Sequence, residues 1–195
     1  GHAGCEAAMA VARCGKSVLV ISLLKDHIGR LSCNPAIGGL AKGNLVREID
    51  ALGGIMAIIA DRSSIQFRRL NTRKGLAVQA SRAQVDIHIY PREMQKELLS
   101  QDNIDFLEGE AAELLTQDGQ VTGILTASND RIECPSVIIT TGTFLSGMMH
   151  RGTEQIRGGR VGEKAAERLS KSLLDLGLRL GRLKTGTCPR LDATT

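Results

Sequence analysis

The sequence predicts an α/β domain, and three observations support that class. A helix-like segment runs directly into a β-branched strand, several short strand-like runs are separated by turn residues, and a continuous apolar run ends in Thr-Gly. The 195 residues are 42% hydrophobic and 24% charged, and no apolar run approaches the ~20 residues of a membrane span. We therefore expect a soluble globular domain with no membrane partner.

The first 22 residues have the pattern of the second half of a βαβ unit. An alanine-rich helix should end near Gly15, and a strand should follow from Ser17 to Ser22. Gly1 and Gly4 take the places of the second and third glycines of the dinucleotide fingerprint GxGxxG, whose helix start binds pyrophosphate. The first glycine and its strand are expected upstream, and Ser22 stands where an acid often holds the ribose.

Residues 32–54, SCNPAIGGLAKGNLVREIDALGG, combine a cysteine, a glycine loop and an amphipathic helix that ends at Gly53. The buried face of this helix is predicted to contain Leu45, Val46, Ile49 and Leu52. Backbone amides of the loop and the charge of Lys42 would favour a thiolate at Cys33. A buried, inert thiol is the alternative interpretation of this cysteine.

Residues 62–92 concentrate positive charge in a chain whose net charge is +4. The cations are Arg68, Arg69, Arg73, Lys74, Arg82 and Arg92. A cofactor pyrophosphate, an RNA backbone or plain solvent could each neutralise them. Since the chain has only three Phe, one Tyr and no Trp, base-stacking recognition of single-stranded RNA cannot rest mainly on this segment.

The second half of the chain predicts a helix at 92–100, a strand at 104–107 and an antiparallel meander. The meander runs are Ala111–Thr116, Val121–Ala127 and Ile132–Cys134. Val137–Thr140 then has the form of a buried parallel strand, and Thr141-Gly142 follows at its carboxyl end. A parallel strand, a meander crossover and another parallel strand are typical of Rossmann-like FAD-binding domains of the glutathione-reductase type. A last helix, with Leu169, Leu173, Leu174 and Leu176 on its apolar side, should stop at Gly177.

The five cysteines form no CxxC pair and are odd in number, which argues against a zinc site and a disulfide framework. No metal ligand set is predicted. A reducing compartment fits best, and we expect a cytoplasmic protein, or a mitochondrial one in a eukaryote.

Five runs together carry a resemblance to a known family. GHAGCEAA, SCNPAIGGLAKGNLVREIDALGG, IQFRRLN, GTFLSG and GRLKTGTCPRLD occur in an order and spacing similar to the glucose-inhibited division protein A family. Its members are the large flavoprotein subunits of the tRNA uridine 5-carboxymethylaminomethyl modification enzyme. The chain departs from the family pattern at Cys188, where proline is expected, and at Leu76, where KGPAV is common.

The resemblance implies a flavin-dependent tRNA-modifying enzyme. It implies FAD in this domain, reduction by NADH, and a one-carbon unit from methylenetetrahydrofolate that is added to carbon 5 of the wobble uridine. It also implies a GTPase partner subunit and a homodimer. Cys33 corresponds to one of the family's two functional cysteines, and the other is expected beyond Thr195. Addition of a thiolate to carbon 6 of uracil is the usual way to activate carbon 5, which suits Cys33 as the nucleophile.

Residues 1–195 are expected to form one FAD-binding α/β domain, incomplete at both ends, with 177–195 leading into an inserted domain. Without its first strand, such a chain should hold flavin weakly and be inactive alone. The expected flavin contacts are Gly1, His2, Ala3, Gly4, Ser22, Ala111, Thr140, Thr141 and Gly142.

Two other functions remain open. One is a different FAD- and NADH-using oxidoreductase of the same fold, with Cys33 as a redox thiol, although the expected CxxxxC pair is absent. The other is a flavin-carrying scaffold that performs no chemistry on RNA. Only the tRNA-modifying enzyme predicts that a knockout loses the carbon-5 side chain.

Overall fold

The structure, a computed structural model, describes residues 1–31, 34–163 and 165–186. The helices are α1 (His2–Arg13), α2 (Lys42–Ala51), α3 (Met56–Ser63), α4 (Ile89–Leu99) and α5 (Arg168–Asp175), with short 3-10 turns η1 (Lys25–His27) and η2 (Leu76–Val78). The strands are β1 (Val18–Ser22), β2 (Ala36–Gly38), β3 (Ser64–Leu70), β4 (Ala80–Val85), β5 (Ile104–Glu108), β6 (Ala111–Gln117), β7 (Gln120–Thr126), β8 (Arg131–Glu133), β9 (Met148–Arg151) and β10 (Glu154–Arg157).

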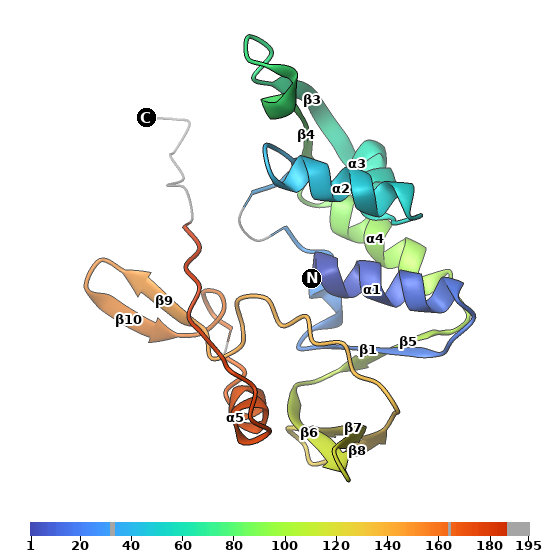
Figure 1. Cartoon of the computed structure of the whole chain (residues 1–195), viewed down its shortest axis with the longest axis vertical. Coiled ribbons are helices and arrows are strands. Elements are labelled where there is room, and N and C mark those ends of the chain that lie inside the picture. Colours follow the sequence, from blue (N-terminus) through green and yellow to red (C-terminus); the bar gives the residue numbers. More distant parts are fainter. Residues whose placement is uncertain (32–33, 164, 187–195) are drawn as a thin grey trace.

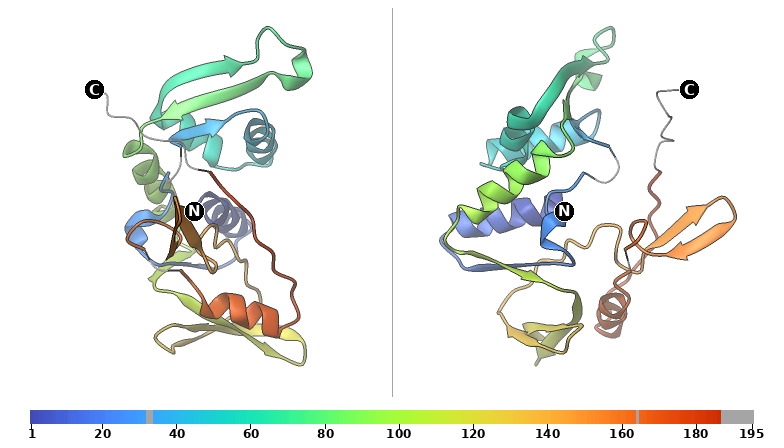
Figure 2. Two further views of the ribbon diagram at one scale, coloured as in Figure 1. Left: turned by 90° about the vertical axis from the view of Figure 1, so that its left-hand side faces the viewer. Right: turned by 180° about the vertical axis from the view of Figure 1, so that it is seen from behind.

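The elements are arranged along the long axis of the molecule (Figure 1). In the middle, β1 and β5 pair in parallel, with Val18 opposite Ile104 and Ser22 opposite Glu108, and α1 lies beside them. The antiparallel sheet β2-β4-β3 lies at one end with α2 and α3, and the meander β6-β7-β8 lies at the other. The hairpin β9-β10 projects to one side (Figure 2). The predicted α/β class, with its parallel pair and meander crossover, is confirmed.

Helix α1 forms as predicted, because its small residues allow it to pack closely. Its buried residues, Cys5, Ala8, Met9 and Ala12, recur at three- and four-residue spacing. Gly15 adopts a φ of +72° just after the helix, which lets the chain reverse into β1. The Asn103 side chain then donates to the carbonyls of Ala12 and Lys16, at 2.9 and 2.8 Å, and holds the turn against β5.

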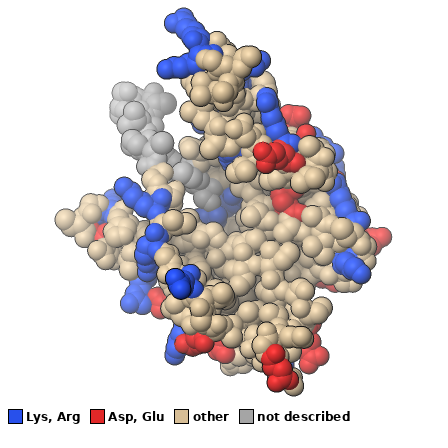
Figure 3. Space-filling model, viewed as in Figure 1, with Lys and Arg blue, Asp and Glu red and all other residues tan. Residues whose placement is uncertain are grey.

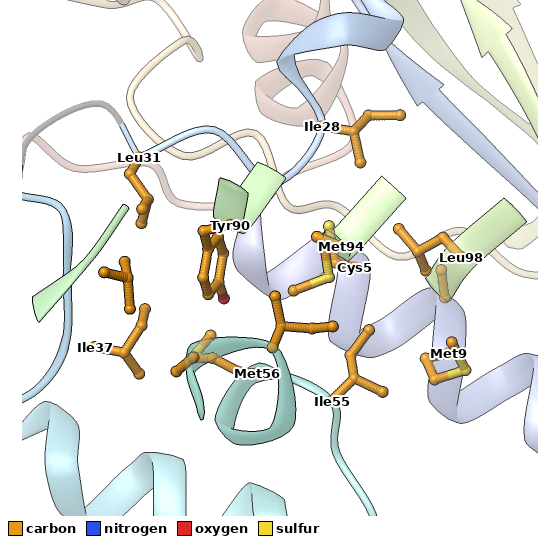
Figure 4. Packing of buried hydrophobic residues seen from close by; sticks show 14 of the residues in the cluster. Cys5, Met9, Ile28, Leu31, Ile37, Ile55, Met56, Tyr90, Met94 and Leu98 are labelled. Carbon is orange, nitrogen blue, oxygen red and sulfur yellow. The ribbon is translucent and has the colours of Figure 1, made fainter. Parts of the chain in front are cut away.

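The main core lies where α1, α3 and α4 meet (Figure 4). The largest side chains that are almost completely buried are Tyr90, Met9, Ile55, Ile59, Met94, Leu98 and Val85. Each of these apolar side chains contributes about 1.5–3 kcal/mol when it is fully removed from water. The core therefore fixes the position of α1, and with it the helix start that the fingerprint glycines form.

Glu6 ties α1 to α3 across this core. Its carboxylate accepts hydrogen bonds from the backbone N–H groups of Ile55, at 3.0 Å, and Met56, at 2.5 Å, which open α3. An acidic group there satisfies amides that have no intrahelical acceptor and complements the helix dipole. Gly54 allows the approach, since a Cβ atom there would lie 2.8 Å from Glu6 Oε2.

The meander agrees with its turn chemistry. Asp118 and Gly119 have φ values of +51° and +76°, the conformation of a two-residue type I′ hairpin turn between β6 and β7. The next turn is held by Asp130, whose backbone N–H donates to Thr126 Oγ1 at 3.0 Å and whose carboxylate accepts from Ser128 Oγ. The turns predicted at Asp118-Gly119 and at 128–130 are therefore confirmed.

The predicted strand Val137–Thr140 is not a strand in the structure. Ile138 is 61% exposed and Ile139 39% exposed, so the segment is not a buried apolar strand either. A strand needs a neighbour for its ladder hydrogen bonds, and no strand in the described residues pairs with this segment. The prediction of a second parallel crossover strand is therefore wrong for this chain, although Thr140 still reaches the start of α1.

The predicted apolar face of α2 is also wrong in part. Leu45 is 59% exposed and Leu52 is 90% exposed. The helix packs instead through Gly43, which is buried against the Ser81 carbonyl, and through Val46, which contacts the core. Gly43 has no side chain, so it allows the close approach that turns this stripe, rather than the leucines, towards the sheet.

Helix α3, the sheet β2-β4-β3 and the hairpin β9-β10 were not predicted from the sequence. Strand β3 reads SIQFRRL, and both Ile65 and Phe67 are exposed, so it lacks the alternation of a half-buried strand. β10 is exposed along its whole length. Strand β3 therefore forms because it pairs with β4, and β10 because it pairs with β9, rather than because of a local sequence pattern.

Candidate functional site

A pocket opens where the end of β1, the start of α1 and the start of β6 come together. Its volume is about 180 Å³. It is lined by the helix start (Gly1, Gly4, Cys5), the end of β1 and the turn that follows (Val20–Leu24, His27, Ile28), the β5–β6 connection (Gly109–Ala111) and segments from the second half (Thr140, Thr141, Phe144, Arg160, Glu163, Ala166, Leu169). This is the carboxyl edge of the parallel pair, where open α/β sheets bind ligands.

The structure brings most of the predicted flavin contacts to this pocket. Those that line it are Gly1, Gly4, Ser22, Ala111, Thr140 and Thr141. His2 and Ala3 lie in the first turn of α1 but do not line the pocket, and Gly142 follows Thr141 with a φ of +58°. Flavin binding by any of these residues remains a prediction.

The start of α1 presents free backbone amides. The N-cap residue is Gly1, which has no side chain to accept a hydrogen bond from the helix. The first intrahelical bond runs from Cys5 N–H to the Gly1 carbonyl at 3.1 Å. The N–H groups of His2, Ala3 and Gly4 precede that bond, and the positive end of the helix dipole lies with them. No acidic residue lies in the first turn. This end of the helix can therefore bind an anion.

Gly4 is required by a close approach. A Cβ atom at this position would lie 2.8 Å from Thr140 Oγ1, closer than Cβ contacts normally are. The glycine thus lets the segment that ends at Thr140 approach the helix start. The third fingerprint glycine allows close packing in the same way in dinucleotide-binding domains.

The end of β1 carries no acid, as the sequence indicates. Ser22 Oγ donates to the Leu24 carbonyl at 3.0 Å, and the Ser22 carbonyl accepts from Gly109 N–H at 2.8 Å. The Ser22 side chain is thus used by its own turn. The carboxylates that line the pocket come instead from Glu110 and Glu163.

A cluster of charges at the pocket was not foreseen from the sequence. Glu163, whose side chain is only 15% exposed, places Oε1 3.3 Å from His27 Nδ1, 3.7 Å from Arg30 Nη1 and 3.6 Å from Arg160 Nη1. The Arg160 guanidinium also lies 5.3 Å from the ring centre of Phe144. The only local sign was the glycine-rich run GGRVGE, which resembles the other loops at this edge.

Two polar atoms of this cluster are buried without a hydrogen-bond partner among the described residues. They are Arg160 Nε and His27 Nδ1, the latter near Glu163 but not in hydrogen-bonding geometry. An unsatisfied buried donor costs about 1–3 kcal/mol, so a polar group that completes the cluster would bind favourably.

His2 faces the core rather than the pocket. Its ring meets the Tyr90 ring edge-on, with 5.6 Å between the ring centres. Burial, assisted by the charges of Lys42 and the terminal amine, lowers the pKa of His2 from 6.5 to about 4. Burial raises the pKa of Tyr90 and of Cys5. His2 is therefore neutral at pH 7 and Cys5 is an inert thiol.

Cys33, the predicted catalytic residue, lies outside the described residues. The chain before it ends at the buried Leu31, and the chain after it enters β2. Lys42 Nζ donates to the Ala36 carbonyl at 3.2 Å, so this lysine holds the glycine loop against its own helix. The reactivity of Cys33 stays a prediction.

A second hollow, of about 290 Å³, is lined by Glu110, Arg157, Ala165, Glu167 and Arg168. Its charged groups already have partners, since Arg157 pairs with Glu167 at 2.8 Å and Arg168 with Glu113 at 2.6 Å. It is therefore a weaker candidate for a ligand than the first pocket.

Two searches were negative for the described part of the chain. No group of three or more His, Cys, Asp or Glu side chains is arranged to hold a metal ion. None of the helices there is long and apolar enough to cross a bilayer.

Comparisons with known proteins give a consistent answer. The sequence profile described as glucose inhibited division protein A matches residues 1–195. The chain is 53% identical to a tRNA uridine 5-carboxymethylaminomethyl modification enzyme MnmG of Campylobacter hominis, over 100% of this chain and 30% of that protein. It is 49% identical to the protein of the same name from Desulfotalea psychrophila, again over 100% of this chain and 30% of that protein.

Solved structures agree with the sequence matches. Aquifex aeolicus GidA superposes with a TM-score of 0.91 at 46% identity, over 96% of this chain and 31% of that chain. A GidA-related protein from Thermus thermophilus shares the fold, with a TM-score of 0.61 at 16% identity, over 92% of this chain and 66% of that one. The chain thus spans about 30% of the length of the curated relatives it matches.

Proposed function

We propose a function from one premise: the chain belongs to the glucose inhibited division protein A family. The proposed function is the FAD-binding part of a flavin-dependent tRNA-modifying enzyme. The observation that carries it is the convergence of Gly1, Gly4, Ser22, Ala111, Thr140 and Thr141 on one pocket. The relatives are named as tRNA uridine modification enzymes, and this name supplies the reaction class.

The residues at the pocket fit a flavin dinucleotide. The free amides of His2, Ala3 and Gly4 suit a pyrophosphate, and the unpartnered Arg160 Nε offers a further donor. A volume of about 180 Å³ is small beside the ~300–1,000 Å³ of typical ligand pockets. The enclosed space would therefore hold one portion of the dinucleotide, and the rest would extend beyond it. When bound, FAD supplies two-electron redox chemistry.

The proposed reaction adds a carboxymethylaminomethyl-type group to carbon 5 of the wobble uridine. NADH would supply the reducing equivalents and methylenetetrahydrofolate the one-carbon unit. The Cys33 thiolate would add to carbon 6 of the uracil, and this addition makes carbon 5 nucleophilic. The thiolate would leave again when carbon 5 loses its proton and the ring regains its double bond. A GTPase partner, a homodimeric assembly and a cytoplasmic location complete the proposal.

The division of work within the chain follows from the geometry. The start of α1 would bind negative charge, Gly4 keeps that start open to the segment at Thr140, and Glu163 contacts two arginines and His27 at the pocket. Cys33 precedes β2 by three residues in the sequence, outside the residues that line the pocket. Cofactor binding and the nucleophile therefore belong to consecutive parts of the chain.

Analysis of wobble nucleosides tests the proposal. A strain that lacks the full-length protein should lose the carbon-5 side chain from the affected tRNAs, and the wild-type gene should restore it. Intact wobble nucleosides in that strain would contradict tRNA modification and leave the oxidoreductase and scaffold alternatives. Purified full-length protein should also bind FAD and oxidise NADH, which separates a failure of the flavin step from a failure of the RNA step.

A further inference from the structure

The hairpin formed by β3 and β4 carries positive charge without any acid. Between Ser64 and Val85 the sequence contains five cations and no Asp or Glu. The cations are Arg68, Arg69, Arg73, Lys74 and Arg82. The hairpin projects from one end of the molecule, and basic side chains mark its tip (Figure 3). Such a surface attracts polyanions.

These five charges are not neutralised within the described residues. None of them takes part in an ion pair, whereas Arg30, Arg62, Arg157, Arg160 and Arg168 each contact a glutamate. Arg68 also lies directly opposite Arg82 in the β3-β4 ladder. Like charges in that position destabilise a sheet, so the pair does not contribute to the stability of the fold.

Exposed apolar side chains accompany the cations. Ile65 is 67% exposed, Phe67 64% and Leu76 79%. Phe67 shares a face of β3 with Arg69, two residues further on, and an aromatic face near a guanidinium group suits an unstacked base. A single aromatic residue stacks on few bases, so most of the affinity would have to come from phosphate contacts.

The position of the hairpin bears on which group neutralises its cations: a cofactor pyrophosphate, an RNA backbone or solvent. None of its residues lines the pocket at the start of α1, so a pyrophosphate bound there would not neutralise them. Strand β4, however, also pairs with β2, where Gly38 lies opposite Arg82 and Gly39 N–H donates to the Ser81 carbonyl at 2.9 Å. Gly38 follows Cys33 by five residues. The basic hairpin and the end of the Cys33 loop are thus parts of one sheet.

We propose that the β3-β4 hairpin is the surface on which this protein docks the phosphate backbone of its RNA substrate, beside strand β2, which follows Cys33 in the sequence. The proposal rests on the proposed function. Arg47 of α2, which donates to Ser81 Oγ at 3.0 Å, extends the surface. An acidic protein is the competing occupant, but a backbone of regularly spaced anions matches a run of cations without acids more closely.

The test measures RNA affinity of the full-length protein with the ladder pair neutralised. The probe is an unmodified tRNA transcript with uridine at the wobble position, followed by fluorescence anisotropy at several salt concentrations. R68Q/R82Q should bind it at least tenfold more weakly at low salt, and the salt slope should fall by about 1 for each lost phosphate contact. The matched control, R157Q/R168Q, removes two exposed arginines that have glutamate partners and should bind within about twofold of the wild type.

The outcomes separate this proposal from the function it rests on. A wild-type protein that fails to bind the transcript would overturn both. Two outcomes would overturn only the hairpin surface. In one, the wild type and R68Q/R82Q bind the transcript with equal affinity. In the other, R68Q/R82Q and the control lose the same amount of affinity. Unchanged RNA binding together with a lower assembly mass in size-exclusion chromatography would assign the hairpin to a protein interface instead. Because R68Q/R82Q removes a like-charge contact, its thermal unfolding temperature should be no lower than that of the wild type.

Discussion

The pocket and the β3-β4 hairpin both have arginines, but the two regions neutralise these charges differently. At the pocket, the mostly buried Glu163 contacts Arg30, Arg160 and His27. On the hairpin, Arg68 and Arg82 lie side by side, and neither has an ion-pair partner among the described residues. The first set joins two segments of the chain, residues 27–30 and 160–163. The second set contributes nothing comparable to the fold.

This difference separates positioning from recruitment. A cation with a buried acidic partner is fixed in place, so it can orient a small ligand but has little charge left to attract a large one. An exposed cation without a partner acts at a distance and is screened by salt. The pocket is therefore suited to a tightly held cofactor, and the hairpin to a polyanion that must bind and leave.

Cys33 lies between these regions in the sequence, and its substitution should separate them most clearly. In the full-length enzyme, Cys33→Ser should abolish modification of the wobble uridine, because a serine hydroxyl is a far weaker nucleophile than a thiolate at pH 7. FAD content, NADH oxidation and affinity for the tRNA transcript should stay at wild-type levels. The measurements are wobble-nucleoside analysis and flavin absorbance.

Cys14 is the matched control for this prediction. It is exposed at the end of α1, so Cys14→Ser should leave the modified nucleoside in place and cost at most about 1 kcal/mol of stability. Modification at the wild-type rate by Cys33→Ser would show that Cys33 has no covalent role.

The pocket could be predicted from the sequence to a greater degree than the hairpin. Gly1, Gly4 and the strand that ends at Ser22 belong to a local pattern with a fixed geometric meaning, so their position at one sheet edge follows from spacing. Glu163 and Arg160 could not be placed in this way. The contact between Glu163 and His27 joins residues more than 130 positions apart, and only the tertiary fold brings them together.

The errors have a common physical cause. The apolar runs at Leu45, Leu52 and Ile138 were interpreted as buried, yet all three side chains are exposed. Periodicity shows which residues share a face, but not whether another element covers it. At α2 the close contact is made by Gly43, a residue that no hydrophobic pattern detects.

Gly4→Ala should affect the pocket and spare the hairpin. The added Cβ would lie 2.8 Å from Thr140 Oγ1, so the helix start and the Thr140 segment must separate. We expect the affinity for FAD to fall at least tenfold, measured by flavin fluorescence titration, with RNA binding unchanged. Gly4→Ala/Thr140→Ala removes the contacting oxygen and should recover part of the loss relative to Gly4→Ala. If the double variant is no better than Gly4→Ala, the close approach is not the cause.

Burial of His2 predicts that stability falls in mild acid. The pKa of His2 is about 4 in the folded state against 6.5 unfolded, so the unfolded state binds the extra proton first. The contribution is complete above pH 6.5 and is lost as the pH falls towards 4, by up to about 3 kcal/mol. Denaturant unfolding at several pH values measures it. His2→Phe should flatten the curve between these pH values, and His150→Gln, a change on exposed β9, should not. Equal curves for wild type and His2→Phe would contradict the assignment.

The smallest expected effect compares two glutamates that differ mainly in burial. Glu163 is 15% exposed and contacts Arg30, Arg160 and His27, whereas Glu167 is 52% exposed and pairs with Arg157. Glu163→Gln should lower the free energy of unfolding by about 1–3 kcal/mol, because it leaves partly buried cations without an acid. Glu167→Gln should cost at most about 1 kcal/mol, because solvent already screens that pair. Urea unfolding measures both costs, once in low salt and once in about 0.5 M salt, where interactions between exposed charges are strongly screened. The cost of Glu163→Gln should persist in salt and that of Glu167→Gln should vanish. If both costs vanish, the cations at the pocket are held no more firmly than those of an exposed pair, and the contrast between the two regions fails.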